Sequence, residues 1–150
     1  MSEIIGEKNE MIVFEGMTNM LSFAQLLRNN NLKNTRTLIT LNSVTNVERF
    51  LTRYSDYNGK IFLCLDGDQA GNDTTVKVLR TFNNSNVKDI RSLYNISENG
   101  HNDLNDYLQN KFTIQNKHLE LRTETCTIGK GREQNIIGCA FDTDSLFRKR

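Results

Sequence analysis

The stretch that most constrains this chain is an apolar run that ends in two aspartates. Residues 61–65 are all apolar, a length too short for a buried helix and typical of a strand covered on both faces. Asp66, Gly67 and Asp68 follow at once, and a helical pattern begins after them. Ligands bind at the carboxyl ends of strands in parallel α/β sheets. Two carboxylates at such a turn repel each other unless a cation lies between them, which favours a divalent metal held by oxygen ligands.

The rest of the chain alternates short apolar segments with helical periodicity. This order predicts an α/β fold with about four mainly parallel strands, flanked by helices and joined by right-handed crossovers. Charged residues in the fourth strand indicate an edge position. The pattern predicts strands at residues 11–14, 37–41, 60–65 and 87–93, and helices at residues 17–27, 44–54, 69–82 and 104–112.

The two ends of the chain differ from this central part. Residues 1–10 are expected to form a polar lead-in to a domain at residues 11–112. In the extension at residues 113–150, alternation near residues 119–127 and an apolar run at 135–141 predict a C-terminal β-hairpin. A flexible basic tail is the alternative, because Lys and Arg outnumber Asp and Glu in this part of the chain.

Composition limits the classes of function. The chain has 150 residues and a net charge of +1, so charge alone does not indicate nucleic-acid binding. Its three cysteines lack Cys-x-x-Cys spacing, which argues against a zinc ribbon or a disulfide framework and predicts a cytoplasmic protein. No stretch approaches the roughly 18 apolar residues of a membrane span, so we expect no membrane association.

Acidic residues follow two of the predicted strands. Glu15 ends the first strand, and Asp66 with Asp68 ends the third. If the sheet is parallel, these three carboxylates lie on one rim, and Asp103 at the start of the last helix can reach it. Carboxylates around Mg²⁺ are suited to phosphoryl transfer, because the metal neutralises phosphate oxygens while a free carboxylate moves a proton.

Each acid also has a purely structural interpretation. Asp68 and Asp103 precede helices, where an aspartate often only caps the helix and favours its positive dipole end. Glu15 ends an apolar strand before Gly16, a place where capping would favour Asp, Asn, Ser or Thr instead. A functional role is therefore favoured for Glu15 more strongly than for the two aspartates.

These motifs together resemble a known family. Three segments are similar to a Toprim domain: Glu15-Gly16 with residues 19–22, Leu65 with the Asp-Gly-Asp-x-Ala-Gly form of residues 66–71, and the segment 103–108. This domain is the catalytic module of bacterial DNA primases, topoisomerases, OLD-type nucleases and recombination-mediator proteins. The second and third segments resemble the primase branch, including primase-like proteins of bacterial plasmids, phages and mobilisable elements. The resemblance implies a Rossmann-like Toprim fold over about residues 10–112.

The resemblance also assigns roles. It implies that Glu15 is a general acid or base that can also touch metal, and that Asp66 and Asp68 bind Mg²⁺ or Mn²⁺. Asp103, Gly67, Gly16 and Asn19 are possible additional site residues. Two positions depart from the family: Asn19 stands where aspartate is common, and Asn102 where the primase branch commonly has lysine.

The implied function is magnesium-dependent phosphodiester or nucleotidyl-transfer chemistry, most closely primer synthesis in a mobile-element replication or mobilisation protein. DNA and nucleotides are the expected partners. No zinc-ligand spacing is present and about ten residues precede the first strand, so another domain or a partner protein is expected to supply the DNA-binding surface. A Toprim nuclease and a non-catalytic nucleic-acid-binding or assembly module are the alternatives.

Two other classes with acidic strand ends fit less well. Haloacid-dehalogenase-type phosphatases want threonine two positions after the second aspartate, where this chain has Ala70. Receiver domains normally place a pair of acids at the end of the first strand, where this chain has Glu15 alone.

Overall fold

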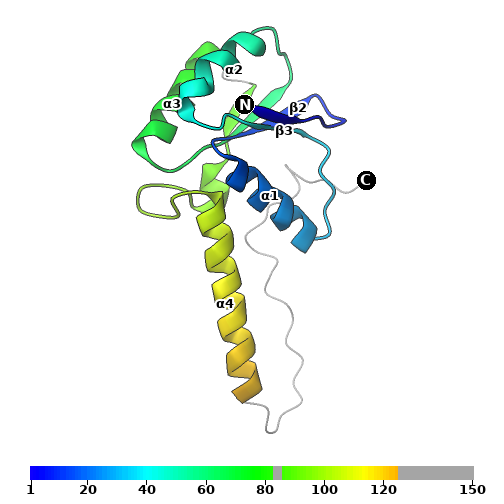
Figure 1. The fold of residues 1–150 in the computed structure, drawn as a ribbon, viewed down its shortest axis with the longest axis vertical. Coiled ribbons are helices and arrows are strands. Elements are labelled where there is room, and N and C mark those ends of the chain that lie inside the picture. Colours follow the sequence, from blue (N-terminus) through cyan, green and yellow to red (C-terminus); the bar gives the residue numbers. More distant parts are fainter. Residues whose placement is uncertain (83–85, 125–150) are drawn as a thin grey trace. The chain divides into compact units, whose positions relative to one another are not determined.

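A five-stranded, mostly parallel sheet organises the first 108 residues (Figure 1). The computed structural model describes residues 1–82 and 86–124, with side chains described through residue 114. Residues 1–108 form one compact unit and residues 109–150 belong to a second. In spatial order the strands are β1 (Ser2–Ile4), β3 (Thr37–Thr40), β2 (Glu10–Phe14), β4 (Lys60–Cys64) and β5 (Val87–Asp89).

Parallel pairing places β2 and β4 in the middle of the sheet. β2 pairs in parallel with both β3 and β4, and β4 pairs in parallel with β5. β1 is antiparallel to β3 and forms one edge. The α/β fold and the edge position of the last strand, both predicted from the sequence, are confirmed.

Helices cover both faces of the sheet. Figure 1 shows α1 on the side opposite α2 and α3. Because side chains alternate along a strand, Met11 and Val13 pack with Phe50 and Val78 in one core, while the Phe14 ring lies 5.5 Å from the Phe23 ring of α1. The helices are α1 (Met17–Asn29), α2 (Val47–Arg53), α3 (Gln69–Thr81) and α4 (Leu104–Glu124), with 3₁₀ helices at Val44–Asn46 and Arg91–Tyr94.

The expected polar lead-in contains a strand. Residues Ser2–Ile4 pair with β3, so the sheet has five strands rather than about four. Arg53 of α2 donates a hydrogen bond to Glu3 at 2.7 Å, which ties this strand to the helix layer. Its three residues are partly buried or exposed, so they give no apolar alternation from which a strand could be predicted.

The fourth predicted strand is shorter than expected. It ends at Asp89 instead of residue 93, and a 3₁₀ helix follows. The Asp89 carboxylate accepts a hydrogen bond from the Arg91 backbone N–H at 3.0 Å, which turns the chain away from the sheet.

The α3 helix buries different residues from those expected. The spacing of the apolar residues in this helix predicts an inward face at Val76, Leu79 and Phe82, but Val76 is 43% exposed. Thr74, Thr75 and Val78 are buried instead. Thr75 satisfies its hydroxyl by donating to the Gly71 carbonyl at 2.8 Å, so a polar residue fits that face.

The predicted first strand of the C-terminal hairpin is wrong. Residues 119–124 are helical, because α4 continues to Glu124 instead of ending near residue 112. The rest of the predicted hairpin, including residues 135–141, lies outside the described residues. In the part of the chain that the structure describes, no helix is long and apolar enough to cross a membrane.

We expect the core around β4 to dominate stability. Leu63→Ala removes a fully buried side chain and should lower the free energy of unfolding by about 2–5 kcal/mol. Leu21→Ala, at a leucine that is 60% exposed, should change it by less than about 0.5 kcal/mol. Urea denaturation followed by circular dichroism measures both, and equal effects would contradict this assignment of the core.

Candidate functional site

The parallel register brings two acidic strand ends together. Phe14, the last residue of β2, lies opposite Cys64, the last residue of β4. Glu15 follows Phe14 directly, and Asp66 comes two residues after Cys64. Cys64 itself is buried, and burial raises the pKa of its thiol, so it acts as a small core side chain.

The Glu15 carboxyl is half-buried among other acids. Burial raises its pKa, and the charges of Asp68 and Asp103 raise it further, while a hydrogen bond from the Asp66 backbone lowers it. Its Oε2 atom is buried and accepts no hydrogen bond from the described residues. A buried carboxylate oxygen without a donor is costly, and a bound cation would satisfy it.

Asp66 lies at the centre of the acidic group. Burial raises the pKa of its carboxyl to about 7, helped in turn by the charges of Glu15, Asp103 and Asp68. These mutual effects show that the four acids selected from the sequence lie near one another. The structure therefore brings together residues that are far apart in the chain, at the carboxyl ends of parallel strands.

Asp68 and Asp103 also cap helices, as their structural interpretation predicted. Asp68 is exposed, and its Oδ1 accepts a hydrogen bond from the Gly71 N–H at 2.8 Å at the start of α3. Asp103 Oδ1 accepts from the Asp106 N–H at 2.7 Å at the start of α4. Capping holds both carboxylates beside the helix N-termini, where they satisfy a backbone N–H that has no partner within the helix.

Asn19 connects the acidic group to two helices. This α1 residue is buried, and its Nδ2 donates to Asp66 Oδ1 at 2.7 Å. The hydrogen bond lowers the pKa of Asp66 and partly offsets the neighbouring charges. Asn19 Oδ1 in turn accepts from the Asn105 N–H at 3.4 Å, and the Asn105 side chain accepts from Ser22 at 3.2 Å.

The glycines of the site differ in what they allow. Nothing lies within 4 Å of where a Cβ would stand on Gly16. A Cβ on Gly67 would come within 2.8 Å of the Ser97 backbone, and one on Gly71 would overlap the Asp66 carbonyl. Gly67 and Gly71 are therefore required by close backbone contacts, whereas Gly16 only begins the turn into α1.

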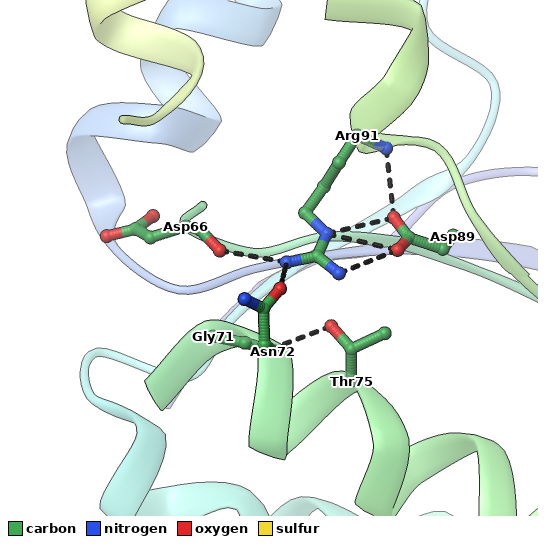
Figure 2. Close-up of polar contacts among 6 residues, drawn as sticks. All are labelled: Asp66, Gly71, Asn72, Thr75, Asp89 and Arg91. Atoms are coloured by element: carbon green, nitrogen blue, oxygen red, sulfur yellow. Dashed lines mark hydrogen bonds and ion pairs between the residues drawn. The ribbon is translucent and has the colours of Figure 1, made fainter. Parts of the chain in front are cut away.

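Three contributing residues were not selected as site residues from the sequence. Asn105 lies within the segment 103–108 that carries the family resemblance, so its motif was a usable signal. Asn72 and Arg91 had no such signal. Figure 2 shows why they matter: Arg91 reaches the Asp66 carbonyl and the Asn72 side chain, while the Asp66 carboxylate points away from it.

The donor set suits a hard cation, although no complete cage is present. Within the described residues, no group of three or more His, Cys, Asp or Glu side chains could hold a metal ion as arranged. Mg²⁺ is commonly held by only one or two carboxylates and keeps several waters. Carboxylate oxygens of Glu15, Asp66 and Asp68, including the unpartnered Glu15 Oε2, therefore fit Mg²⁺ chemically.

The acidic group lies on the carboxyl rim of a mostly parallel sheet, which is the edge at which α/β domains commonly bind ligands. The chain belongs to the Toprim-like family, whose model matches residues 12–108. No curated protein matches the chain.

Two solved structures from bacteriophage T7 are similar. One is the primase fragment of the primase-helicase protein, with 16% identity over 79% of this chain and 43% of that chain, and a TM-score of 0.47. The other is the lagging-strand DNA polymerase interacting with primase domains of two subunits bound to an RNA/DNA hybrid and dTTP. Its identity is 14% over 81% of this chain and 56% of that chain, and its TM-score is 0.48. The chain spans about half the length of the chains it matches.

The raised pKa of Asp66 predicts a pH-dependent stability without metal. The ordinary pKa of 3.8 applies to the unfolded chain and about 7 to the folded one, so the folded state binds more protons between these values. Stability should therefore fall as pH rises through this window. At pH 8, Asp66→Asn should stabilise the metal-free fold because it removes a repelling charge. Solvent screens part of this repulsion, so we expect a gain of only ~1 kcal/mol in the free energy of unfolding. At this chain length that gain raises Tm by about 2–4 °C.

Thermal unfolding in EDTA at several pH values measures this effect. Asp56→Asn, at an exposed aspartate, is the matched control and should keep the wild-type pH dependence. A wild-type stability that rises from pH 4 to pH 7 would contradict the prediction.

Proposed function

We propose that this chain is a magnesium-dependent Toprim module for phosphodiester or nucleotidyl-transfer chemistry, related to DNA primases. The observation that carries the proposal is the convergence of Glu15, Asp66 and Asp68 at the ends of two central parallel strands, where each of the first two carboxyls has a raised pKa. Family membership supports the same chemistry. The proposed relation to the primase branch rests on the Asp-Gly-Asp-x-Ala-Gly form and on the segment 103–108.

In this proposal, Asp66 and Asp68 hold the cation and Glu15 contributes an oxygen or a proton. A bound Mg²⁺ would neutralise phosphate oxygens and orient the attacking and leaving groups. Burial beside other acids raises the pKa of the Glu15 carboxyl, which favours a role for this group in taking up and returning a proton. Asp103 adds negative charge to the group and increases its affinity for a divalent cation.

The partners follow from this chemistry. Nucleic acid, with DNA favoured, and nucleotides present the phosphates that such a site would take. The chain's net charge of +1 gives no strong attraction for DNA, so another domain or a partner protein would supply the DNA-binding surface. A mobile-element replication or mobilisation protein in a bacterial cytoplasm is the proposed setting.

A non-catalytic binding or assembly module is a second candidate. Asn19 stands at a family position that commonly holds aspartate, and Asp68 is already engaged as a helix cap. Such a module would keep the fold and bind nucleic acid or protein without turnover.

Metal binding is the first test. Asp66→Asn/Asp68→Asn should lower Mn²⁺ or Mg²⁺ affinity by at least about tenfold, because it removes the charges that attract the ion. Asp56→Asn/Asp73→Asn changes the net charge equally at exposed positions and should bind as the wild type does. Isothermal titration calorimetry measures both, and equal affinity in the wild type and the site variant would refute the metal site.

Turnover is the second test. We expect Glu15→Gln to lower the rate of nucleotide incorporation on single-stranded DNA by about 100-fold, the usual effect of losing a general acid or base. Its Mn²⁺ affinity should fall less than that of Asp66→Asn/Asp68→Asn, because only one of the acidic charges is lost and the glutamine keeps an oxygen at that position. Nucleotide-independent cleavage of the labelled DNA would assign the chain to the nuclease branch. DNA binding without turnover, unchanged by Glu15→Gln, would support the assembly module.

A further inference from the structure

One peptide group at the site is held at both of its ends. The Asp66 carbonyl and the Gly67 N–H belong to the same planar unit and point in opposite directions. The carbonyl accepts a hydrogen bond from Arg91 Nη1 at 3.1 Å, and the N–H donates to the Asn102 carbonyl at 2.7 Å. Rotation of this peptide would break both hydrogen bonds at once, so the turn between the two aspartates is fixed.

Arg91 is itself held in place from three sides. Its Nε lies 3.1 Å from both Asp89 carboxylate oxygens, and its Nη2 lies 2.8 Å from Asp89 Oδ2. Its Nη1 also donates to Asn72 Oδ1 at 2.7 Å (Figure 2). The side chain is only 12% exposed, so the guanidinium bridges β5, the α3 helix and the end of β4 in a largely dry setting.

The first turn of α3 lies in close contact with the Asp66 carbonyl. Gly71 has no Cβ, and one placed there would overlap the Asp66 carbonyl oxygen. Asn72, the next residue, binds the guanidinium that binds this carbonyl. The strand end and the first turn of α3 are therefore joined through Arg91, and the Asp68 cap belongs to the same turn.

The positive charge of Arg91 is paired with Asp89, whereas its Nη1 donor contacts the backbone of Asp66. Asp89 pairs with the guanidinium at 2.8 Å. The pKa of Asp66 is set by burial, by Glu15, Asp103 and Asp68, and by the hydrogen bond from Asn19. Arg91 therefore acts on Asp66 through the backbone rather than by neutralising its carboxylate.

We propose that Arg91 is a positioning residue that orients the Asp66 and Asp68 carboxylates for metal binding by clamping the peptide between Asp66 and Gly67. This inference rests on the proposed metal-binding function. Only a planar guanidinium supplies donors in the three directions of Asp89, Asn72 and the Asp66 carbonyl. A lysine can keep the ion pair with Asp89 but cannot make all three sets of contacts.

Arg91→Lys should therefore separate position from charge. We expect its Mn²⁺ affinity to fall by about 10–100-fold, the usual effect of losing a residue that orients metal ligands. Asn72→Ala removes one of the two Nη1 contacts and should give a smaller loss. Arg49→Lys, the same substitution at an exposed arginine of α2, is the matched control and should bind as the wild type does.

Amide hydrogen exchange supplies a readout that needs no metal. In Arg91→Lys the Gly67 amide should exchange about tenfold faster, because the peptide is released at its carbonyl end and its hydrogen bond to Asn102 weakens. The Leu63 amide in β4 should exchange at the wild-type rate, which shows that the sheet remains folded.

The outcomes distinguish the two proposals. Metal binding that is lost in Asp66→Asn/Asp68→Asn but unchanged in Arg91→Lys would overturn the positioning role alone. An unchanged Gly67 exchange rate in Arg91→Lys would also overturn it. Equal metal affinity in the wild type and in Asp66→Asn/Asp68→Asn would instead overturn the proposed function, and the metal role of Arg91 with it.

Discussion

The pairing of β2 with β4 is the constraint on which the site depends. Because Phe14 lies opposite Cys64, the chain leaves both strands at the same rim and carries Glu15 and Asp66 to one place. A shift of one residue would turn every side chain of a strand to the other face. Burial on both faces of these strands therefore fixes the register, and the register places the acids. Packing in the core and chemistry at the rim are set by the same pairing.

Gathering four acids at one rim has a cost, which falls mainly on Asp66. Burial and mutual repulsion raise the pKa of Asp66 to about 7, although it would ordinarily be near 3.8. The compensation nearest to its carboxylate is neutral, since Asn19 donates one hydrogen bond to it. The nearby guanidinium of Arg91 is paired with Asp89 and leaves the acidic group largely uncompensated. A divalent cation bound in such a site would relieve this repulsion and would stabilise the folded chain.

The sequence was sufficient for features that depend on residues close together in the chain. The apolar run at residues 61–65 and the acids after it indicated a buried strand and a ligand-binding rim, and the fold is confirmed. It was insufficient where a polar side chain redirects the backbone, as Asp89 does when it ends β5 early. Arg91 was missed for a related reason: its partners include a backbone carbonyl that reaches it only in the folded chain. Val76 was wrongly expected to face inward, because the adjacent Thr75 satisfies its hydroxyl within α3 and takes the buried face instead.

Asp66 and Asp68 can each make a structural hydrogen bond and still offer an oxygen to a metal. A carboxylate has two oxygens and several acceptor positions. Asp68 gives Oδ1 to the Gly71 N–H, and Asp66 gives Oδ1 to Asn19, so each structural hydrogen bond leaves a second oxygen. Because a carboxylate is planar and rigid, a hydrogen bond that holds one oxygen also limits where the other can lie. Helix capping and the Asn19 contact thus restrict how each aspartate can present its remaining oxygen, and the clamped peptide between them fixes the turn from which both side chains extend. The features that first suggested a merely structural role for these acids are the ones that would orient them for a metal.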